Sequence, residues 1–228
     1  MYSLDKLEEK IGYCFQNKNL LKQAMTHSSY TNEQKINQLE NYERVEFLGD
    51  AVLELVASEF MYLNHPTQPE GKLTKMRASA VCEQALALAA KEIEIGQYML
   101  FGKGEESTGG RERESIIADA VEATIGGIFL DGGLEPAKTF ILRFVLNDLE
   151  KKQLFYDSKS ILQEMVQSKK MGDLNYELVD EHGPDHEKSF SVVAKIGNRI
   201  IGIGNGRTKK AAEQNAAYEA IIHKMKIN

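Results

Sequence analysis

Apolar residues recur three and four positions apart through most of the first 150 residues. This spacing is typical of amphipathic helices, which bury one face and expose the other to solvent. Stretches that contain Pro or Gly interrupt the pattern, and such residues commonly mark turns and loops. The pattern therefore predicts an all-α region, with helices over residues 4–12, 19–30, 42–63, 73–93, 114–130 and 134–151 and breaks at 64–71, 101–113 and 131–133.

The pattern changes after residue 157. A helical stretch at 158–170 is followed by three runs of alternating apolar and polar residues and by a last helical stretch at 208–225. The alternating runs cover residues 175–182, 189–198 and 199–205. The order α-β-β-β-α predicts a three-stranded antiparallel sheet with both helices on one face. We therefore predict three parts: an all-α domain at 1–150, a linker at 151–156 and a small α+β domain at 157–226.

The composition is that of an ordinary globular protein, with 42% hydrophobic and 27% charged residues. The net charge of −6 disfavours a polyanionic partner, but the acidic excess lies before residue 157 and the remainder is near neutral. No apolar run is long enough to span a membrane, and the first residues lack the apolar segment that a leader peptide needs. Cys14 and Cys82 fit no metal-binding motif. We therefore expect a cytoplasmic protein with no membrane contact and with two buried, reduced thiols.

A stripe of acids follows one face of the helix predicted over residues 42–63. Its members are spaced by three, four and four residues: Glu43, Glu46, Asp50 and Glu54. The opposite side is the predicted core stripe: Val45, Leu48, Val52, Leu55 and Val56. Phe47 and Leu53 flank the acids, and Gly49 leaves room for a close neighbour. Carboxylates in such apolar surroundings either hold a proton or bind a cation, whereas a solvated or salt-bridged face is the alternative.

A second pair of acids lies in the helix predicted over residues 114–130. Asp119 and Glu122 are three residues apart on one helical face, and almost every neighbouring residue is small or apolar. Two apolar helices with inward-facing carboxylates can build a metal site between them. Oxygen ligands without His or Cys favour hard cations such as Mg²⁺ and Mn²⁺. Glu70, in the predicted loop at 64–71, is a further candidate ligand.

The stretch YERVEFLGDAVLEL, residues 42–55, closely resembles the signature helix of the ribonuclease III family. The resemblance continues through PEGKLTKMRA at 69–78, through STGGRERESIIADAVEATIGGIFLDGG at 107–133 and through the whole C-terminal region. It covers essentially the full chain in the family's order. The chain thus resembles the minimal bacterial type, which has one nuclease domain and one double-stranded-RNA-binding domain.

The resemblance implies roles for six acids. Four match the family's direct metal ligands: Glu46, Asp50, Asp119 and Glu122. Among these, Asp50 and Glu122 are also expected to be catalytic, and Glu122 matches the position most critical for cleavage. Glu43 and Glu70 match supporting acids at the edge of the site, whereas Glu54 matches no ligand.

The implied reaction is Mg²⁺-dependent endonucleolytic hydrolysis of double-stranded RNA, with Mn²⁺ as a substitute and without an organic cofactor. A metal ion held by carboxylates can activate water and stabilise the leaving oxygen. The family implies 5′-phosphate and 3′-hydroxyl ends with two-nucleotide 3′ overhangs, and the processing of ribosomal, messenger and other structured RNA precursors. Such overhangs need two centres facing opposite strands, so a homodimer is implied. Phe47 matches the family's dimer-interface aromatic, with a core position as the alternative.

The C-terminal module resembles a double-stranded-RNA-binding domain in three segments: KSILQEMVQ at 159–167, HGPDHEKSF at 182–190 and GRTKKAAEQNAA at 206–217. The resemblance implies groove contacts by one set of residues: Gln163, Glu164, Gln167, Gly183, Pro184, Asp185 and His186. Lys209 and Lys210 are expected to contact phosphates. The last helix supports this independently, because Thr208 is a suitable N-cap and two lysines in the first turn oppose the helix dipole. A helix N-terminus with two lysines suits a phosphate.

The main alternative function is that of a noncatalytic dimeric protein that binds double-stranded RNA, which the loss of one acid would favour. A di-iron bundle would require ligand histidines, but His27 and His65 lack Glu-x-x-His spacing. Glu213 stands where the family often has a third basic residue, which implies slightly weaker binding. Three arginines are either further contacts to the RNA backbone or ordinary surface residues: Arg77, Arg111 and Arg113.

Overall fold

The structure is a computed structural model of the 228-residue chain, and it describes residues 3–147, 158–183, 188–206 and 208–225. The chain divides into two compact units, Met1–Leu149 and Glu150–Asn228. The predicted linker at 151–156 lies outside the described residues. No helix among the described residues is long and apolar enough to cross a membrane.

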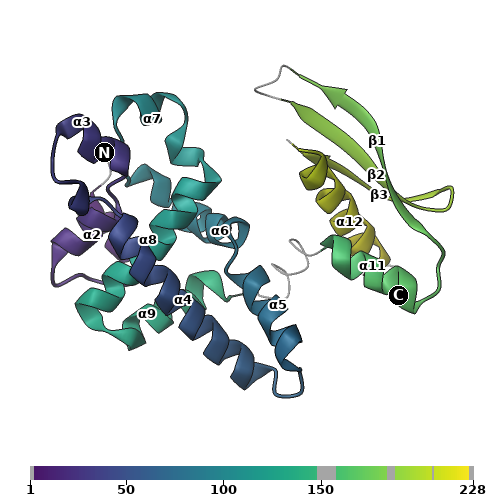
Figure 1. The fold of residues 1–228 in the computed structure, drawn as a ribbon, viewed down its shortest axis with the longest axis horizontal. Coiled ribbons are helices and arrows are strands. Elements are labelled where there is room, and N and C mark those ends of the chain that lie inside the picture. The colour runs from purple at the N-terminus through teal and green to yellow at the C-terminus, as the bar shows by residue number, and fades with distance from the viewer. Residues whose placement is uncertain (1–2, 148–157, 184–187, 207, 226–228) are drawn as a thin grey trace. The chain divides into compact units, whose positions relative to one another are not determined.

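The first unit consists of helices and short helical turns around one hydrophobic core (Figure 1). Its elements are α1 (Leu4–Ile11), α2 (Lys18–Ala24), α3 (Ser28–Gln34), η1 (Gln38–Glu40), α4 (Glu43–Asn64), α5 (Glu70–Ala80), α6 (Glu83–Ile93), η2 (Ile95–Gln97), α7 (Lys103–Ser107), η3 (Gly110–Glu112), α8 (Glu114–Gly132), α9 (Leu134–Phe140) and the π-helical η4 (Ile141–Val145). The prediction of an all-α domain is therefore confirmed. Among its described residues, the sole strand-like pairing is an isolated bridge between Thr26 and Leu100.

Two helices that the sequence predicts as continuous are broken in the structure. The segment predicted at 19–30 forms α2 and α3, with an extended backbone at His27 between them. His27 caps α3, because its Nδ1 accepts a hydrogen bond from Ser29 N at 3.1 Å, and its backbone N–H donates to the carbonyl oxygen of Leu100 at 3.0 Å. The segment predicted at 73–93 forms α5 and α6, because the backbone of Cys82 is extended. Periodicity alone missed both breaks.

Helices α4 and α8 cross at two glycines, and this contact determines the centre of the unit. A Cβ on Gly49 would lie 1.8 Å from the carbonyl oxygen of Glu122, and a Cβ on Gly126 would lie 2.1 Å from that of Val45. No side chain larger than hydrogen fits at either position. The prediction that Gly49 permits a close approach is therefore confirmed.

Burial along α4 differs from the predicted core stripe at two leucines. Leu53, which the sequence places beside the acids, is fully buried, whereas Leu55, which it places in the core, is 58% exposed. The reason is that α8 contacts α4 at Gly49, so the buried face is centred closer to Leu53 than the apolar pattern indicates.

The prediction of two buried thiols is wrong for Cys14, which is exposed, while Cys82 is partly buried.

The second unit has the predicted α-β-β-β-α order. It contains α11 (Ser158–Ser168), β1 (Leu174–His182), β2 (Ser189–Ile196), β3 (Arg199–Gly206) and α12 (Lys209–Met225). The strands form an antiparallel sheet in the order β1-β2-β3, with Tyr176 opposite Ala194 and Val193 opposite Ile203. Both helices pack on one face of the sheet, where Leu162 and Ala217 share a core with Ala194.

Small residues bring α12 against β3. A Cβ on Gly204 would lie 2.1 Å from the backbone nitrogen of Ala216, and one on Gly202 would lie 2.1 Å from the carbonyl oxygen of the same residue. The facing positions on α12 are all fully buried alanines: Ala212, Ala216 and Ala220. The helix that begins with Lys209 and Lys210 is thus fixed closely to the sheet.

Gly49→Ala is expected to lower the free energy of unfolding of the first unit by about 3 kcal/mol, because the added methyl group would force α4 and α8 apart. Gly71→Ala is the matched control in the first turn of α5. Its Cβ would meet nothing within 4 Å, and Ala is more stable than Gly in a helix by about 1 kcal/mol. Urea unfolding followed by circular dichroism measures both changes. Similar effects of the two variants would contradict the close crossing.

Candidate active site and nucleic-acid interface

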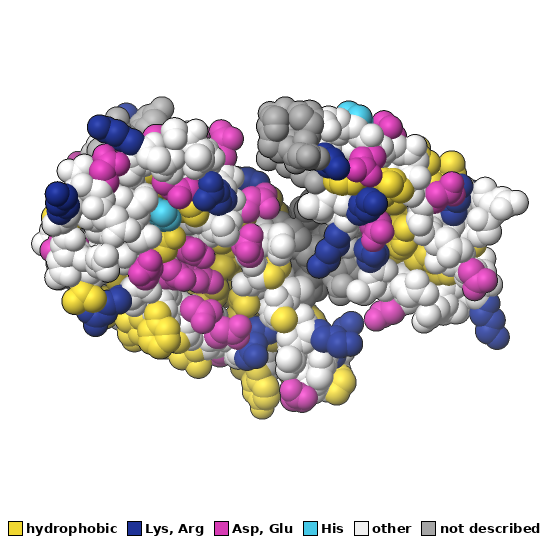
Figure 2. All heavy atoms as spheres, turned by 45° about the horizontal axis from the view of Figure 1, so that its top comes forward, with side chains coloured by type: hydrophobic (Ala, Val, Ile, Leu, Met, Phe, Trp, Pro, Cys, Tyr) yellow, Lys and Arg dark blue, Asp and Glu magenta, His cyan; other side chains and the backbone are white. Residues whose placement is uncertain are grey.

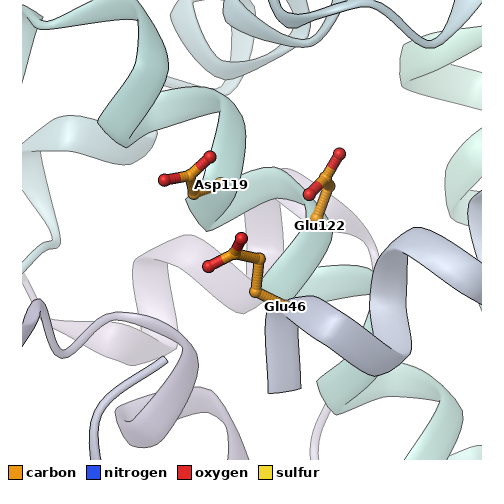
Figure 3. A group of neighbouring side chains, drawn as sticks. All are labelled: Glu46, Asp119 and Glu122. Carbon is orange, nitrogen blue, oxygen red and sulfur yellow. The ribbon is translucent and has the colours of Figure 1, made fainter. Parts of the chain in front are cut away.

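Three carboxylates meet where α4 and α8 cross. Glu46 comes from α4, and Asp119 and Glu122 come from α8, three residues apart on one face. One oxygen of each lies within 4.8 Å of the others, and all three side chains are half-buried. Figure 3 shows Glu46 on one helix facing the two acids on the other. One member of the predicted acidic stripe and the predicted pair on α8 are therefore brought together, because the glycine crossing removes the side chains that would separate them.

The pKa values of these carboxyl groups reflect their crowding. Burial, together with the charges of Asp119, Glu43 and Asp50, raises the pKa of Glu46 to about 7. Burial and the charges of Asp50, Glu46 and Asp119 raise the pKa of Glu122 to about 8. Burial also raises the pKa of Asp119. Like charges that are partly removed from water favour either protons or a cation among them.

The donor set fits a hard divalent cation. Glu46, Asp119 and Glu122 offer carboxylate oxygens alone, and their oxygens are close enough together to share one ion. Asp50 lies one turn after Glu46, is exposed, and makes the largest charge contribution to the raised pKa of Glu122. It therefore lies beside the group of three rather than within it. Figure 2 shows acidic side chains gathered on one face of the first unit.

The supporting acids predicted from the resemblance lie at different places. Glu43 is the first residue of α4, is exposed, and contributes to the raised pKa of Glu46. Glu70 is exposed and is the first residue of α5, so its assignment to a loop is wrong; its carboxylate accepts a hydrogen bond from Thr74 Oγ1 at 2.9 Å. The structure does not bring Glu70 into the group of three acids.

Glu54 belongs to an ion pair instead. Arg77 Nε lies 2.7 Å from a carboxylate oxygen of Glu54, and Arg77 Nη1 donates to Ser58 Oγ at 2.8 Å. The salt-bridged alternative, which the sequence left open for the whole stripe, thus applies to this member. Because Glu54 already has a cationic partner, it is a poor candidate for a metal ligand.

The other two arginines are also paired within the first unit. Arg111 binds both carboxylate oxygens of Glu106, at 2.5 and 2.7 Å, and donates to the carbonyl oxygens of Gly96 and Met99. Arg113 lies 2.6 Å from Glu105. These arginines therefore hold the segment between α6 and α8 in place.

Sequence reasoning assigned no role to Tyr42, which the structure places against the acids. Its hydroxyl donates a hydrogen bond to Asp119 Oδ2 at 3.2 Å, and the residue is only 5% exposed. Burial, followed by the charge of Asp119, raises the pKa of Tyr42 well above its usual value, so the hydroxyl keeps its proton. An aromatic residue directly before Glu43 gives no sequence signal of this contact, because its partner is 77 positions further along the chain and only the fold brings the two together.

A second stripe on α4 is apolar and exposed. Phe47 is 80% exposed, Leu55 is 58% exposed and Tyr62 is 72% exposed, and Ala51 is exposed between them. At 100° per residue these four side chains fall within an arc of about 80° beside the acidic stripe. The core alternative for Phe47 is therefore wrong. An apolar stripe of this kind on a surface helix commonly marks an interaction site.

Three of the residues predicted to contact grooves lie on the outer face of α11. Gln163, Glu164 and Gln167 are all exposed. Gly183 ends the described part of its loop with a positive φ of 96°, a backbone conformation that favours glycine. Pro184, Asp185 and His186 lie outside the described residues.

The start of α12 has the predicted capping. Thr208 Oγ1 accepts a hydrogen bond from Ala211 N at 3.1 Å, which is the bond of an N-cap residue. Lys209 and Lys210 are exposed in the first turn, and Lys209 Nζ lies 5.8 Å from the centre of the Phe190 ring. Two ammonium groups therefore stand at the positive end of the helix dipole, where an anion is favoured.

Glu213 is neutralised by a lysine on the other helix. Its carboxylate forms an ion pair with Lys159 Nζ, which lies 4.9 Å from the centre of the Tyr176 ring. Lys159 precedes Gln163 by one turn of α11, and Glu213 follows Lys209 by one turn of α12. The ion pair thus joins the two helical faces that carry the predicted RNA contacts.

The raised pKa of Glu122 predicts how pH affects the metal-free protein. Because this pKa is about 8 in the folded chain and near 4.5 in the unfolded one, the folded state holds the extra proton. The free energy of unfolding in EDTA should therefore fall as pH rises from 5 to 8.5. Glu122→Gln should reduce that fall, whereas Glu9→Gln, at an exposed acid on α1, should leave it unchanged. Urea unfolding at both pH values measures this, and parallel behaviour of Glu122→Gln and the unmodified chain would contradict it.

Comparison with known proteins bears on both units. The Ribonuclease-III-like family matches residues 17–149, and the double-stranded RNA binding motif matches residues 158–223. Ribonuclease 3 of Caldanaerobacter subterraneus subsp. tengcongensis is 49% identical over 96% of each chain. Ribonuclease 3 of Bacillus licheniformis is 47% identical over 95% of this chain and 88% of its own.

A solved structure agrees with the first unit. The nuclease domain of ribonuclease III from Campylobacter jejuni superposes with a TM-score of 0.59 and 43% identity, covering 63% of this chain and 96% of that one. The 49% and 47% identity to the two ribonuclease 3 sequences over nearly the full length, together with the matches to both units in order, shows the family. The chain belongs to the ribonuclease III family, whose enzymes are endoribonucleases specific for double-stranded RNA.

Proposed function

We propose that this chain hydrolyses phosphodiesters in double-stranded RNA in a Mg²⁺-dependent reaction that leaves 5′-phosphate and 3′-hydroxyl ends. The observation that carries the proposal is the group of Glu46, Asp119 and Glu122, whose oxygens lie within 4.8 Å of one another and whose pKa values are raised. The carboxylates in such a group repel one another, and a divalent cation bound among them offsets this repulsion. Mn²⁺ has the same preference for oxygen ligands and is expected to substitute.

The half-buried acids and the exposed acids would have different roles. Glu46, Asp119 and Glu122 would hold the cation, with Asp50 beside them as a fourth ligand. When bound, the cation supplies an activated water and stabilises charge on the phosphate oxygens. Burial and the neighbouring charges raise the pKa of Glu122 to about 8, so loading the site requires it to release a proton near neutral pH. Glu43 and Glu70 remain proposed supporting acids.

The second unit would hold the duplex. A-form RNA offers a shallow minor groove and regularly spaced phosphates, so a rigid domain can recognise its shape by touching both. Gln163, Glu164 and Gln167 are exposed along one helix for the groove, and Lys209 and Lys210 are exposed at a helix N-terminus for the phosphates. Groove contacts by residues 183–186 are proposed as well, although residues 184–186 lie outside the described part of the chain.

We further propose a homodimer that uses the apolar stripe of Phe47, Ala51, Leu55 and Tyr62. Two-nucleotide 3′ overhangs need two centres facing opposite strands, and the stripe lies beside the acids on the same helix. The nuclease domain of ribonuclease III from Campylobacter jejuni has a region involved in dimer formation. Sedimentation equilibrium should give twice the chain mass, and a monomer at micromolar concentration would contradict the proposal.

The substrates would be ribosomal, messenger and other structured RNA precursors in the cytoplasm.

A noncatalytic RNA-binding protein is the competing function. It is disfavoured because all six positions expected to carry acids do so and because three of them form one group. Incubation with long duplex RNA, with and without Mg²⁺, separates the two, since binding without cleavage would favour the competitor.

Glu122→Gln should reduce cleavage by at least about 10²-fold, because it removes a carboxylate that would hold the cation, and the cation would stabilise the charge of the transition state. Its gel-shift affinity for duplex RNA in EDTA should stay within about twofold, since the second unit is unchanged. Glu54→Gln is the control on α4, and it should retain cleavage because Glu54 is paired with Arg77 and makes only the smallest of the charge contributions to the raised pKa of Glu122. If both variants were equally impaired, Glu54 would belong to the site as well. Loss of RNA binding by Glu122→Gln would assign that residue a structural role.

Replacing Lys209 and Lys210 together by Ala should weaken binding and reduce the salt dependence of log K by about 1 to 2, because two phosphate contacts are lost. The control is Lys188→Ala with Lys195→Ala in the same unit. These lysines are paired with Glu181 and Glu177 on the sheet, so the control removes the same charge elsewhere. Fluorescence anisotropy across a salt series measures the slopes. An equal change in both double variants would indicate general electrostatic attraction instead of defined contacts.

A further inference from the structure

We infer that Tyr42 is a positioning residue for the metal site: its hydroxyl holds the Asp119 carboxylate beside Glu46 and Glu122, so that divalent cations bind more tightly. The inference rests on the proposed metal site and goes beyond it, because Tyr42 offers no carboxylate and would act only through Asp119. The experiments below therefore measure metal affinity separately from cleavage.

The hydrogen bond reaches Asp119 from the protein interior. Tyr42 is 5% exposed, and its hydroxyl donates to Oδ2 of Asp119 at 3.2 Å. The bond engages one carboxylate oxygen and leaves Oδ1 for a cation. This is the arrangement in which an outer partner orients a metal ligand, and removing such partners commonly weakens metal binding by about 10–100-fold.

Tyr42 is itself fixed by contacts at both ends. Its backbone N–H donates to the carbonyl oxygen of Thr26 at 2.9 Å, and its ring lies against the His27 ring with centroids 5.6 Å apart. Its own carbonyl oxygen accepts the backbone N–H of Glu46 at 2.8 Å. One residue thus connects the ligand on α4, the ligand on α8 and the segment between α2 and α3. The hydroxyl is therefore held in place.

The hydrogen bond is needed because the acids repel one another. The charge of Asp119 is the largest charge contribution to the raised pKa of Glu46, and it also contributes to that of Glu122. In the metal-free protein, a freely rotating Asp119 would turn away from both glutamates to reduce this repulsion. A fixed donor opposes the rotation, so the site keeps its ligand geometry before a cation arrives. The free-energy cost of ordering the ligands on binding is therefore smaller.

The same chain contains a matched bond outside the site. Tyr13 donates from its hydroxyl to Asp131 Oδ2 at 2.9 Å, and Asp131 also accepts from the backbone nitrogens of Gln16 and Asn17. Tyr13→Phe therefore removes a tyrosine–aspartate hydrogen bond of the same chemistry. A general effect of losing such a bond would appear in both variants, whereas an effect on the metal site would appear in Tyr42→Phe alone.

The first measurement is the affinity of the full chain for Mn²⁺, by isothermal titration calorimetry without RNA and with Mg²⁺ as competitor. Tyr42→Phe should weaken binding about 10-fold, while Tyr13→Phe should match the unmodified chain. Circular dichroism in EDTA checks the folding of each variant. Tyr42→Met, a flexible apolar residue without a hydrogen-bond donor, provides a second test if Tyr42→Phe folds poorly. Unchanged affinity in a folded Tyr42 variant, or an equal loss in Tyr13→Phe, would overturn the inference.

The second measurement is cleavage of duplex RNA as a function of Mg²⁺ concentration. Tyr42→Phe should need about 10-fold more Mg²⁺ for half-maximal rate and should approach the unmodified rate at saturation, because its ligands are all present. A lower plateau with an unchanged Mg²⁺ requirement would overturn the positioning role. If no form of the chain cleaves RNA, the proposed function fails, but the Mn²⁺ comparison still decides the role of Tyr42.

Discussion

The close crossing of α4 and α8 is the contact on which the rest of the first unit depends. Gly49 and Gly126 each lie against the backbone of the other helix, at distances where a methyl group would overlap a carbonyl oxygen. Helices normally pack about 8–10 Å apart because side chains separate them. Removing those side chains lets Glu46 on one helix and Asp119 and Glu122 on the other come within 4.8 Å. The acid group is thus a consequence of backbone packing.

The closeness of these acids destabilises the folded chain when no cation is bound. Burial and mutual repulsion raise the pKa of Glu46 to about 7 and that of Glu122 to about 8, so the metal-free chain holds protons where a cation is expected. The favourable packing around the site offsets this cost, because α8 is lined by fully buried residues such as Val121 and Ile125. Local conflict of this kind within an otherwise consistent core is typical of functional sites.

The second unit also contains close packing at glycines, here between a helix and a sheet. Glycines on β3 face alanines on α12, so the helix lies directly on the sheet. This packing fixes the direction of the helix N-terminus, where Thr208 caps the first turn and Lys209 and Lys210 are exposed. The ion pair between Lys159 and Glu213 joins α11 to α12 on the side of the predicted contacts. A rigid spacing suits a partner that is recognised by the shape of its grooves.

Much of this architecture follows from the sequence. The period of the apolar residues separates an all-α region from an α-β-β-β-α region, and both are confirmed. The helical spacing of Glu46 with Asp50, and of Asp119 with Glu122, places each pair on one face. Resemblance of the motifs to the ribonuclease III family, which the comparisons confirm, added the roles expected of these acids and separated Glu54 from them.

The sequence by itself determined which residues share a helix face, because that depends on local geometry alone. Only the tertiary structure decided which faces meet. It buries Leu53 and exposes Leu55, and it pairs Arg77 with Glu54. It also brings the hydroxyl of Tyr42 to Asp119, although 77 residues separate them along the chain. These contacts depend on how helices distant in sequence approach one another, and helical periodicity carries no information about that approach.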